Sequence, residues 1–181
     1  MLVGADKTDS LAPGGACNVL DYVSKKFNTV TRSSFAAELR NQLEASQAGV
    51  YFSAFLQENL MPTLTAMPLA KMQDAGLFSL KPLVMGDNDG VFRAVTSENP
   101  KAASEPILTP HIRAYREMID THQVGGIGWC DNRDMVADPL TKGKTRRHNL
   151  NIMLNQGRWI VQNATMQWPV TAQGPNTRSR L

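Results

Sequence analysis

The sequence has few of the residues on which metal clusters, disulfides and membrane spans depend. Its 181 residues include two cysteines, Cys17 and Cys130, which form no CxxC pair, and three histidines that share no zinc-ligand spacing with them. It has no run of about 18 apolar residues, so no membrane-spanning helix and no membrane partner is expected. Its beginning, MLVGADKTDS, lacks the basic start and apolar centre of a signal peptide. We therefore expect reduced thiols and an intracellular protein, with cytoplasm and nucleus both open.

Charge is modest in total but uneven along the chain. The net charge is +3, which is small for a strong nucleic-acid binder, while 42% hydrophobic residues are enough to form a core. The basic residues gather in one run that contains Lys142, Lys144, Arg146 and Arg147. Such a run is either a solvated surface or a contact for phosphates.

Helical and strand patterns alternate along the chain. The clearest helix follows the capping residues Ser33 and Ser34, because apolar residues recur there at three- and four-residue steps until Pro62 stops it. The order of strand, helix, strand, helices, strand and two helices indicates an α/β fold. The other expected elements are strands at 17–26, 80–85 and 126–130 and helices at about 88–97, 109–124, 131–139 and 145–156.

The same patterns predict four segments. Residues 1–16 are expected to be irregular, 17–143 to form the domain, 144–161 to form a basic helix with a short extension, and 162–181 to be a disordered tail.

Three acidic residues stand out by their places in this pattern. Glu38 lies in the first turns of the long helix, Asp87 follows the strand LKPLVM, and Asp138 lies on the short helix after the strand GIGWC. Strand ends and helix starts meet at one edge of an open α/β sheet, where three carboxylates can hold Mg²⁺ or Mn²⁺. The alternative is that they are ordinary helix caps and surface charges. Trp129 on the strand GIGWC is predicted to be a core residue rather than a base-stacking platform.

Four segments resemble the ribonuclease H domain of copia-type retrotransposon polyproteins and occur in the family order. They are VSKKFNTVTRSSFAAEL, LVMGDNDGVFRAV, HIRAYREMI and NRDMVADPLTKG, and together they cover about residues 17–143. The matching positions are Ser24-Lys25-Lys26, Ser33-Ser34, Ala37-Glu38, Asp87-Asn88, His111-Ile112 with Tyr115, Ala137-Asp138 and Thr141-Lys142.

The resemblance implies a ribonuclease H-like three-layer fold and hydrolysis of the RNA strand of an RNA–DNA hybrid. Glu38, Asp87 and Asp138 match three of the four catalytic carboxylates of the family, which hold two ions of Mg²⁺ or Mn²⁺ about 4 Å apart. The implied partners are an RNA–DNA hybrid or another nucleic acid and the reverse-transcriptase domain of the same polyprotein. The basic run Lys142, Lys144, Arg146 and Arg147 is the expected nucleic-acid contact.

The sequence also departs from the family pattern. Only 37 residues precede Glu38, and Asp6, Asp9 and Asp21 do not lie where the first catalytic aspartate belongs. We therefore expect an incomplete sheet that lacks the first strand or strands, and little or no activity. Ala36 replaces a family acidic residue, and Pro139 directly after Asp138 is expected to end or distort the short helix. The alternative is a non-catalytic remnant that binds nucleic acid or is purely structural.

Overall fold

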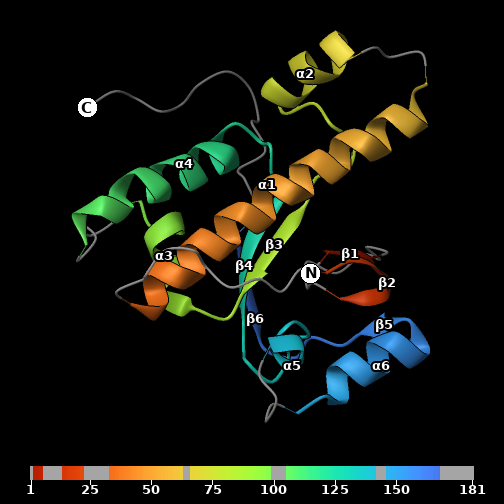
Figure 1. The fold of residues 1–181 in the computed structure, drawn as a ribbon, viewed down its shortest axis with the longest axis vertical. Coiled ribbons are helices and arrows are strands. Elements are labelled where there is room, and N and C mark those ends of the chain that lie inside the picture. Colours follow the sequence, from red (N-terminus) through yellow and green to blue (C-terminus); the bar gives the residue numbers. More distant parts are fainter. Residues whose placement is uncertain are drawn as a thin grey trace.

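The computed structural model describes residues 2–5, 14–22, 33–62, 66–98, 105–141 and 146–167, and has a mixed α/β architecture. Figure 1 shows a long helix that crosses one sheet, with further helices beside it and a second small sheet in the other part of the molecule. The α/β class is the one that the sequence predicted.

Two strands form a hairpin in the N-terminal part. Strand β1 (Leu2–Ala5) pairs antiparallel with β2 (Gly15–Asp21). The prediction that residues 1–16 are irregular is therefore wrong for β1 and for Gly15 and Ala16, which begin β2. Pairing satisfies the backbone hydrogen bonds on the facing sides of the two strands, although neither carries a clear alternation of apolar and polar residues. Of the predicted strand 17–26, residues 23–26 lie outside the described residues.

Helix α1 (Ser34–Leu60) confirms the clearest prediction from the sequence. The Ser33 side chain accepts a hydrogen bond from the backbone N–H of Ala36 at 3.1 Å, which satisfies one of the free donors of the first turn. The helix continues through Gly49 because this glycine faces Pro82, where its small size permits close packing. It ends just before Pro62.

The middle of the chain alternates helices with one strand. The helix expected at about 88–97 is α3, and Asn88 caps it by accepting the Val91 N–H at 3.2 Å. Gly76 has a φ of 63°, which lets the chain turn after α2. The elements are α2 (Ala66–Asp74), β3 (Leu83–Gly86), α3 (Asp89–Thr96), the 3-10 helix η1 (Pro106–Leu108) and α4 (Thr109–Asp120).

The C-terminal part contains β4 (Gly126–Cys130), α5 (Asp138–Thr141), α6 (His148–Gln156), β5 (Arg158–Trp159) and β6 (Ala164–Gln167). The prediction that Pro139 ends the short helix is wrong, because Pro139 lies in the first turn of α5, where a missing N–H costs nothing. The prediction of a disordered tail from 162 is wrong for β6, which pairs with β4. Residues 168–181 lie outside the described residues.

The described strands form two sheets of three strands, in the orders β1-β2-β5 and β3-β4-β6. Strands β3 and β4 run parallel, with Gly86 beside Trp129, whereas β6 runs antiparallel to β4. Each sheet has its own core. The first core lies at the β3-β4-β6 sheet and contains Leu39, Val84, Val91, Tyr115 and Ile127. The second core lies at the β1-β2-β5 sheet and contains Cys17, Val136, Leu150 and Met153.

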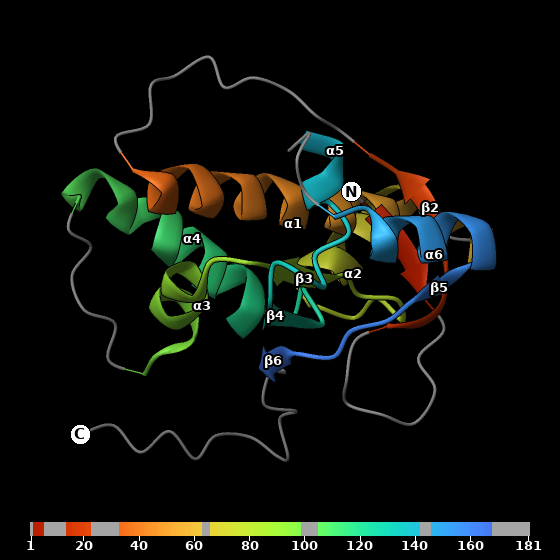
Figure 2. The ribbon, with the colours of Figure 1, turned by 90° about the horizontal axis from the view of Figure 1, so that it is seen from below.

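Figure 2 shows these two parts side by side, with α1, α3 and α4 around β3 and β4, and with α6 beside β2 and β5. Among the described helices, none is long and apolar enough to cross a membrane.

Candidate functional site

The candidate site lies at the carboxyl ends of the parallel strands β3 and β4. Asp87 follows the last residue of β3 directly, and the Trp129 indole N–H donates a hydrogen bond to the backbone oxygen of Asp87 at 2.9 Å. This bond fixes the backbone of Asp87 against the neighbouring strand. Carboxyl ends of parallel strands are the usual place for ligand sites in open α/β sheets.

Helix α1 lies across β3 and runs in the opposite direction. A side-chain carbon at Gly49 would lie 2.7 Å from Cβ of Pro82, just before the strand begins. A side-chain carbon at Gly86, at the end of the strand, would overlap the amide of Gln42. The N-terminal turns of α1 are therefore above the carboxyl end of β3.

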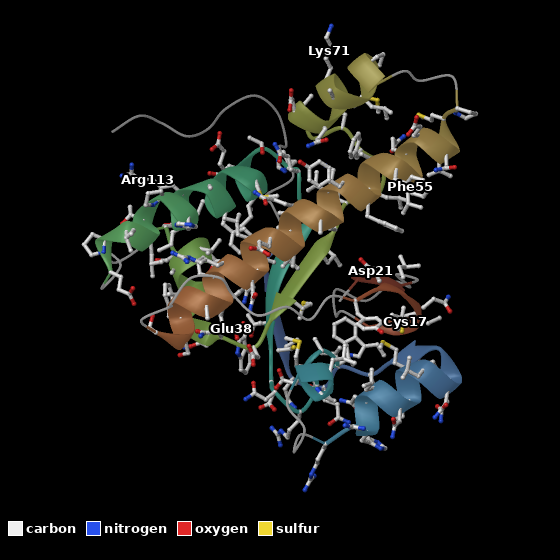
Figure 3. All side chains as sticks on the ribbon, in the orientation of Figure 1. Cys17, Asp21, Glu38, Phe55, Lys71 and Arg113 are labelled. Carbon is white, nitrogen blue, oxygen red and sulfur yellow. The ribbon has the colours of Figure 1, made fainter. Side chains whose placement is uncertain are left out.

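Glu38 lies on this part of α1. It stands four positions before Gln42, so its backbone lies about 6 Å from that of Gln42 along the helix axis, on the N-terminal side. Phe35, one turn earlier on the same face, lies 3.6 Å from the position that a Cβ of Gly90 would take. Glu38 thus stands between Gln42 above Gly86 and Phe35 above the start of α3, on the side where Asp87 leaves the strand. Figure 3 labels Glu38 on this half of α1.

Asp138 begins α5 and is buried, with 9% of its surface exposed. It and Asp87 both act on the thiol of Cys130, the last residue of β4. Burial raises the pKa of Cys130 to about 12, and the negative charges of Asp134, Asp87, Asp131 and Asp138 contribute in that order. The charges of these four carboxylates therefore all act on one buried thiol at the end of β4.

The structure accordingly places all three predicted carboxylates at the same end of the sheet. The charges of Asp87 and Asp138 both act on Cys130 at the end of β4, and Glu38 lies above β3 on α1. In the described part of the chain, however, no three His, Cys, Asp or Glu side chains are grouped closely enough to hold a metal ion. The three carboxylates share a location, but they are not assembled into a metal centre.

The predicted basic contact is described only in part. Lys142 and Lys144 lie outside the described residues, whereas Arg146 and Arg147 are exposed just before α6. The Asn149 side chain donates a hydrogen bond to the backbone oxygen of Arg133 at 2.7 Å, so the start of α6 lies against the loop that follows β4. Arg133 is also exposed, and its guanidinium pairs with Asp131 at 2.8 Å.

Three residues that matter here do not stand out in the sequence. Gln42 fits over Gly86, Trp129 fixes the backbone of Asp87, and Asp134 holds the loop between β4 and α5. The sequence predicts a core residue at Trp129, but its indole also has a definite polar partner. The glycine that ends the strand LVMG is the one local signal of a close contact.

Comparison of the chain with protein-family models, with curated proteins and with solved structures gave no match.

Proposed function

We propose that this chain is a ribonuclease H-like domain of a copia-type retroelement polyprotein that binds an RNA–DNA hybrid and hydrolyses it weakly or not at all. One observation carries the proposal. The α1–β3 crossing brings Glu38 to the strand end where Asp87 stands, and the charge of Asp138, at the start of α5, acts on Cys130 at the end of the adjacent parallel strand. These are the three positions that match family carboxylates in the sequence.

The form of the sheet also supports an incomplete version of this fold. Within the described ranges, β3 pairs on one side only, with β4. A strand edge with unpaired N–H and C=O groups accepts a further strand. Among the described strands, the open edge of β3 agrees with a domain in which the first catalytic aspartate is missing.

The carboxylates have the right chemistry for Mg²⁺ or Mn²⁺, since these hard cations prefer oxygen ligands. Their arrangement does not fit a two-ion centre, because the described residues bring no three acidic or other ligating side chains together. No hydrolytic step through a metal ion follows from this arrangement. Weak or absent cleavage is the behaviour that it supports, which also favours the non-catalytic alternative over an active nuclease.

Binding to nucleic acid is assigned to the basic run. Arg146 and Arg147 are exposed and lie close in sequence to the start of α6, which contacts the loop after β4. A hybrid that lay along this loop would place its phosphates beside the carboxyl end of the sheet. Phosphate contacts give an affinity that falls as salt rises and that does not depend on base sequence.

The test is a binding measurement on the full chain by fluorescence anisotropy with a labelled RNA–DNA hybrid. Replacing Lys142, Lys144, Arg146 and Arg147 by Ala should weaken binding and flatten the dependence of affinity on salt. The slope of log binding constant against log salt concentration should become less steep by about 0.9 for each phosphate that is no longer neutralised. A control that removes two charges in place of four replaces the exposed arginines Arg93 and Arg113 by Ala.

The control should leave the slope unchanged. Equal binding and equal slopes in the parent chain and the four-residue variant would show that the run is only a solvated surface. Absence of hybrid binding in the parent chain would refute the proposed function.

A further inference from the structure

One buried residue, Asp134, ties the loop after β4 to the C-terminal part of the chain. Only 4% of its surface is exposed. Its Oδ2 accepts the backbone N–H of Gln162 at 2.9 Å and that of Asn163 at 2.7 Å. Hydrogen bonds from backbone N–H groups to a carboxylate are roughly twice as strong as neutral ones. The side chain is therefore committed to this contact.

Backbone groups of the same turn add to the connection. The Trp159 indole N–H donates to the backbone oxygen of Asp134 at 3.0 Å. The backbone N–H of Asp131 donates to the backbone oxygen of Asn163 at 3.0 Å. Together these bonds join the turn 131–134 to the segment 159–163, and we call this contact the Asp134 clamp.

The clamp lies where the chain passes from one sheet to the other. Strand β5, which ends at Trp159, pairs with β2, whereas β6, which begins at Ala164, pairs with β4. Among the described strands none pairs with both sheets, so the short segment between β5 and β6 connects them. Figure 1 shows this segment running from β5 near α6 to β6 behind β4.

Asp138 stands four residues after Asp134 on the same stretch of chain. Between them, Val136 is 4% exposed and packs into the second core with Cys17 and Met153. The stretch that carries Asp138 is thus fixed on the side of the β1-β2-β5 sheet. Asp87, in contrast, belongs to the β3-β4-β6 sheet. The position of Asp138 relative to Asp87 consequently depends on how the two sheets are joined.

We propose that Asp134 is a positioning residue, which holds Asp138 beside the end of β4 by clamping the segment between β5 and β6. The importance of Asp138 in this inference rests on the proposed function. The clamp itself rests on the hydrogen bonds and burial of Asp134. Because Asp134 is only 4% exposed and its Oδ2 accepts two backbone N–H groups, its effect on the site runs through Asp138.

The experiment compares Asp134→Asn with Asp131→Asn in the full chain. Both changes remove one negative charge near Cys130, but the Asp131 carboxylate pairs with Arg133 in its own loop and does not contact residues 159–163. Amide hydrogen exchange is measured by NMR for Gln162, Asn163 and, as a reporter of global unfolding, the buried Val50 of α1. The amide and carboxyl resonances of Asp138 are recorded on the same samples.

In Asp134→Asn we expect protection at Gln162 and Asn163 to fall by at least about tenfold relative to Val50, because two charge-assisted hydrogen bonds are weakened. We also expect both Asp138 resonances to move. Asp131→Asn should leave the exchange at 162 and 163 and the Asp138 resonances in place. Trp159→Phe, which keeps an aromatic ring and removes the N–H, should give a smaller change in the same direction.

Unchanged protection at 162 and 163 in Asp134→Asn would overturn the clamp. Reduced protection with Asp138 resonances that stay in place would overturn the positioning role and leave Asp134 as a purely structural residue. If Asp134→Asn does not fold, Trp159→Phe decides between these results. Hybrid binding by the parent chain is measured separately, so its absence would refute the proposed function without changing the outcome for the clamp.

Discussion

The crossing of α1 over β3 makes a sharp prediction about Gly86. A methyl group at this position would overlap the amide of Gln42, which is 6% exposed and has little room to move. Adding a carbon to a well-packed interior costs about 1–3 kcal/mol. Alanine regains about 0.5–1 kcal/mol over glycine in a strand interior. Gly86→Ala should therefore lower the free energy of unfolding by up to about 2.5 kcal/mol.

A double-mutant cycle assigns this cost to the contact. In a Gln42→Ala background the space above Gly86 is open, and Gly86→Ala should then be neutral or stabilising. The coupling between the two changes should be about 1–3 kcal/mol, in the range found for residues in contact. Gln47→Ala, at an exposed glutamine on the same helix, is the matched control and should show no coupling.

The assay is urea denaturation followed by circular dichroism for the four proteins of each cycle. If Gly86→Ala costs the same with and without Gln42, then α1 does not cross β3 at this point. Glu38 would then no longer be assigned to the strand end that carries Asp87, and the candidate site would lose one of its three carboxylates.

Three further predictions concern the buried residues. Leu39→Ala should lower the free energy of unfolding by about 2–5 kcal/mol, because Leu39 is 0% exposed in the first core. Leu154→Ala, at a side chain that is 61% exposed, should change it by under about 0.5 kcal/mol. Equal costs of the two changes in urea denaturation would contradict the packing of α1. The Cys130 thiol is 0% exposed, and burial raises its pKa to about 12. It should therefore resist iodoacetamide at a pH of about 8 in the folded chain and react in denaturant. Fast alkylation of the native protein would show that the end of β4 is open. Burial raises the pKa of Tyr115 above that of a free phenol, so folded stability should be lost as pH rises above about 10. An ultraviolet titration should show the Tyr115 phenol ionising only as the chain unfolds, and ionisation of Tyr115 in the folded chain would contradict its burial.

Local signals were sufficient for the elements that begin and end at distinctive residues. The Ser33 cap, the helical period after it and Pro62 predicted α1 nearly residue for residue, and the apolar segment GIGWC predicted β4. These signals lie within a few residues of the element that they define, so no knowledge of the fold is needed to use them.

The errors fell where pairing partners are distant in sequence. Strand β6 exists because it pairs with β4, and nothing in its own composition separates it from a loop. The same holds for β1, which pairs with β2. Pro139 was expected to stop a helix, although a proline in the first turn is compatible with a helix that begins one residue earlier.

The candidate site was predictable in location but not in detail. The ends of β3 and β4 could be located from the sequence, so Asp87 and Asp138 were expected at one edge. The contacts that fix them could not, since Trp129 acts on a partner 42 positions away, Asp134 on one 28 positions away, and Gln42 through a helix crossing. Whether three carboxylates converge depends on shifts smaller than the width of a side chain, and sequence spacing does not determine such shifts.

The central claim is that Glu38, Asp87 and Asp138 share one end of the sheet without forming a complete two-ion centre. The most direct test is incubation of the purified chain with a labelled RNA–DNA hybrid in Mg²⁺ and, separately, in Mn²⁺, with the products separated by size. We expect the hybrid to remain intact or nearly so, because magnesium demands near-octahedral oxygen coordination and misplacement of catalytic groups by about 1 Å can cost on the order of 100-fold in rate. Robust cleavage of the RNA strand that is abolished by Asp87→Asn would contradict the claim and show that these three carboxylates suffice.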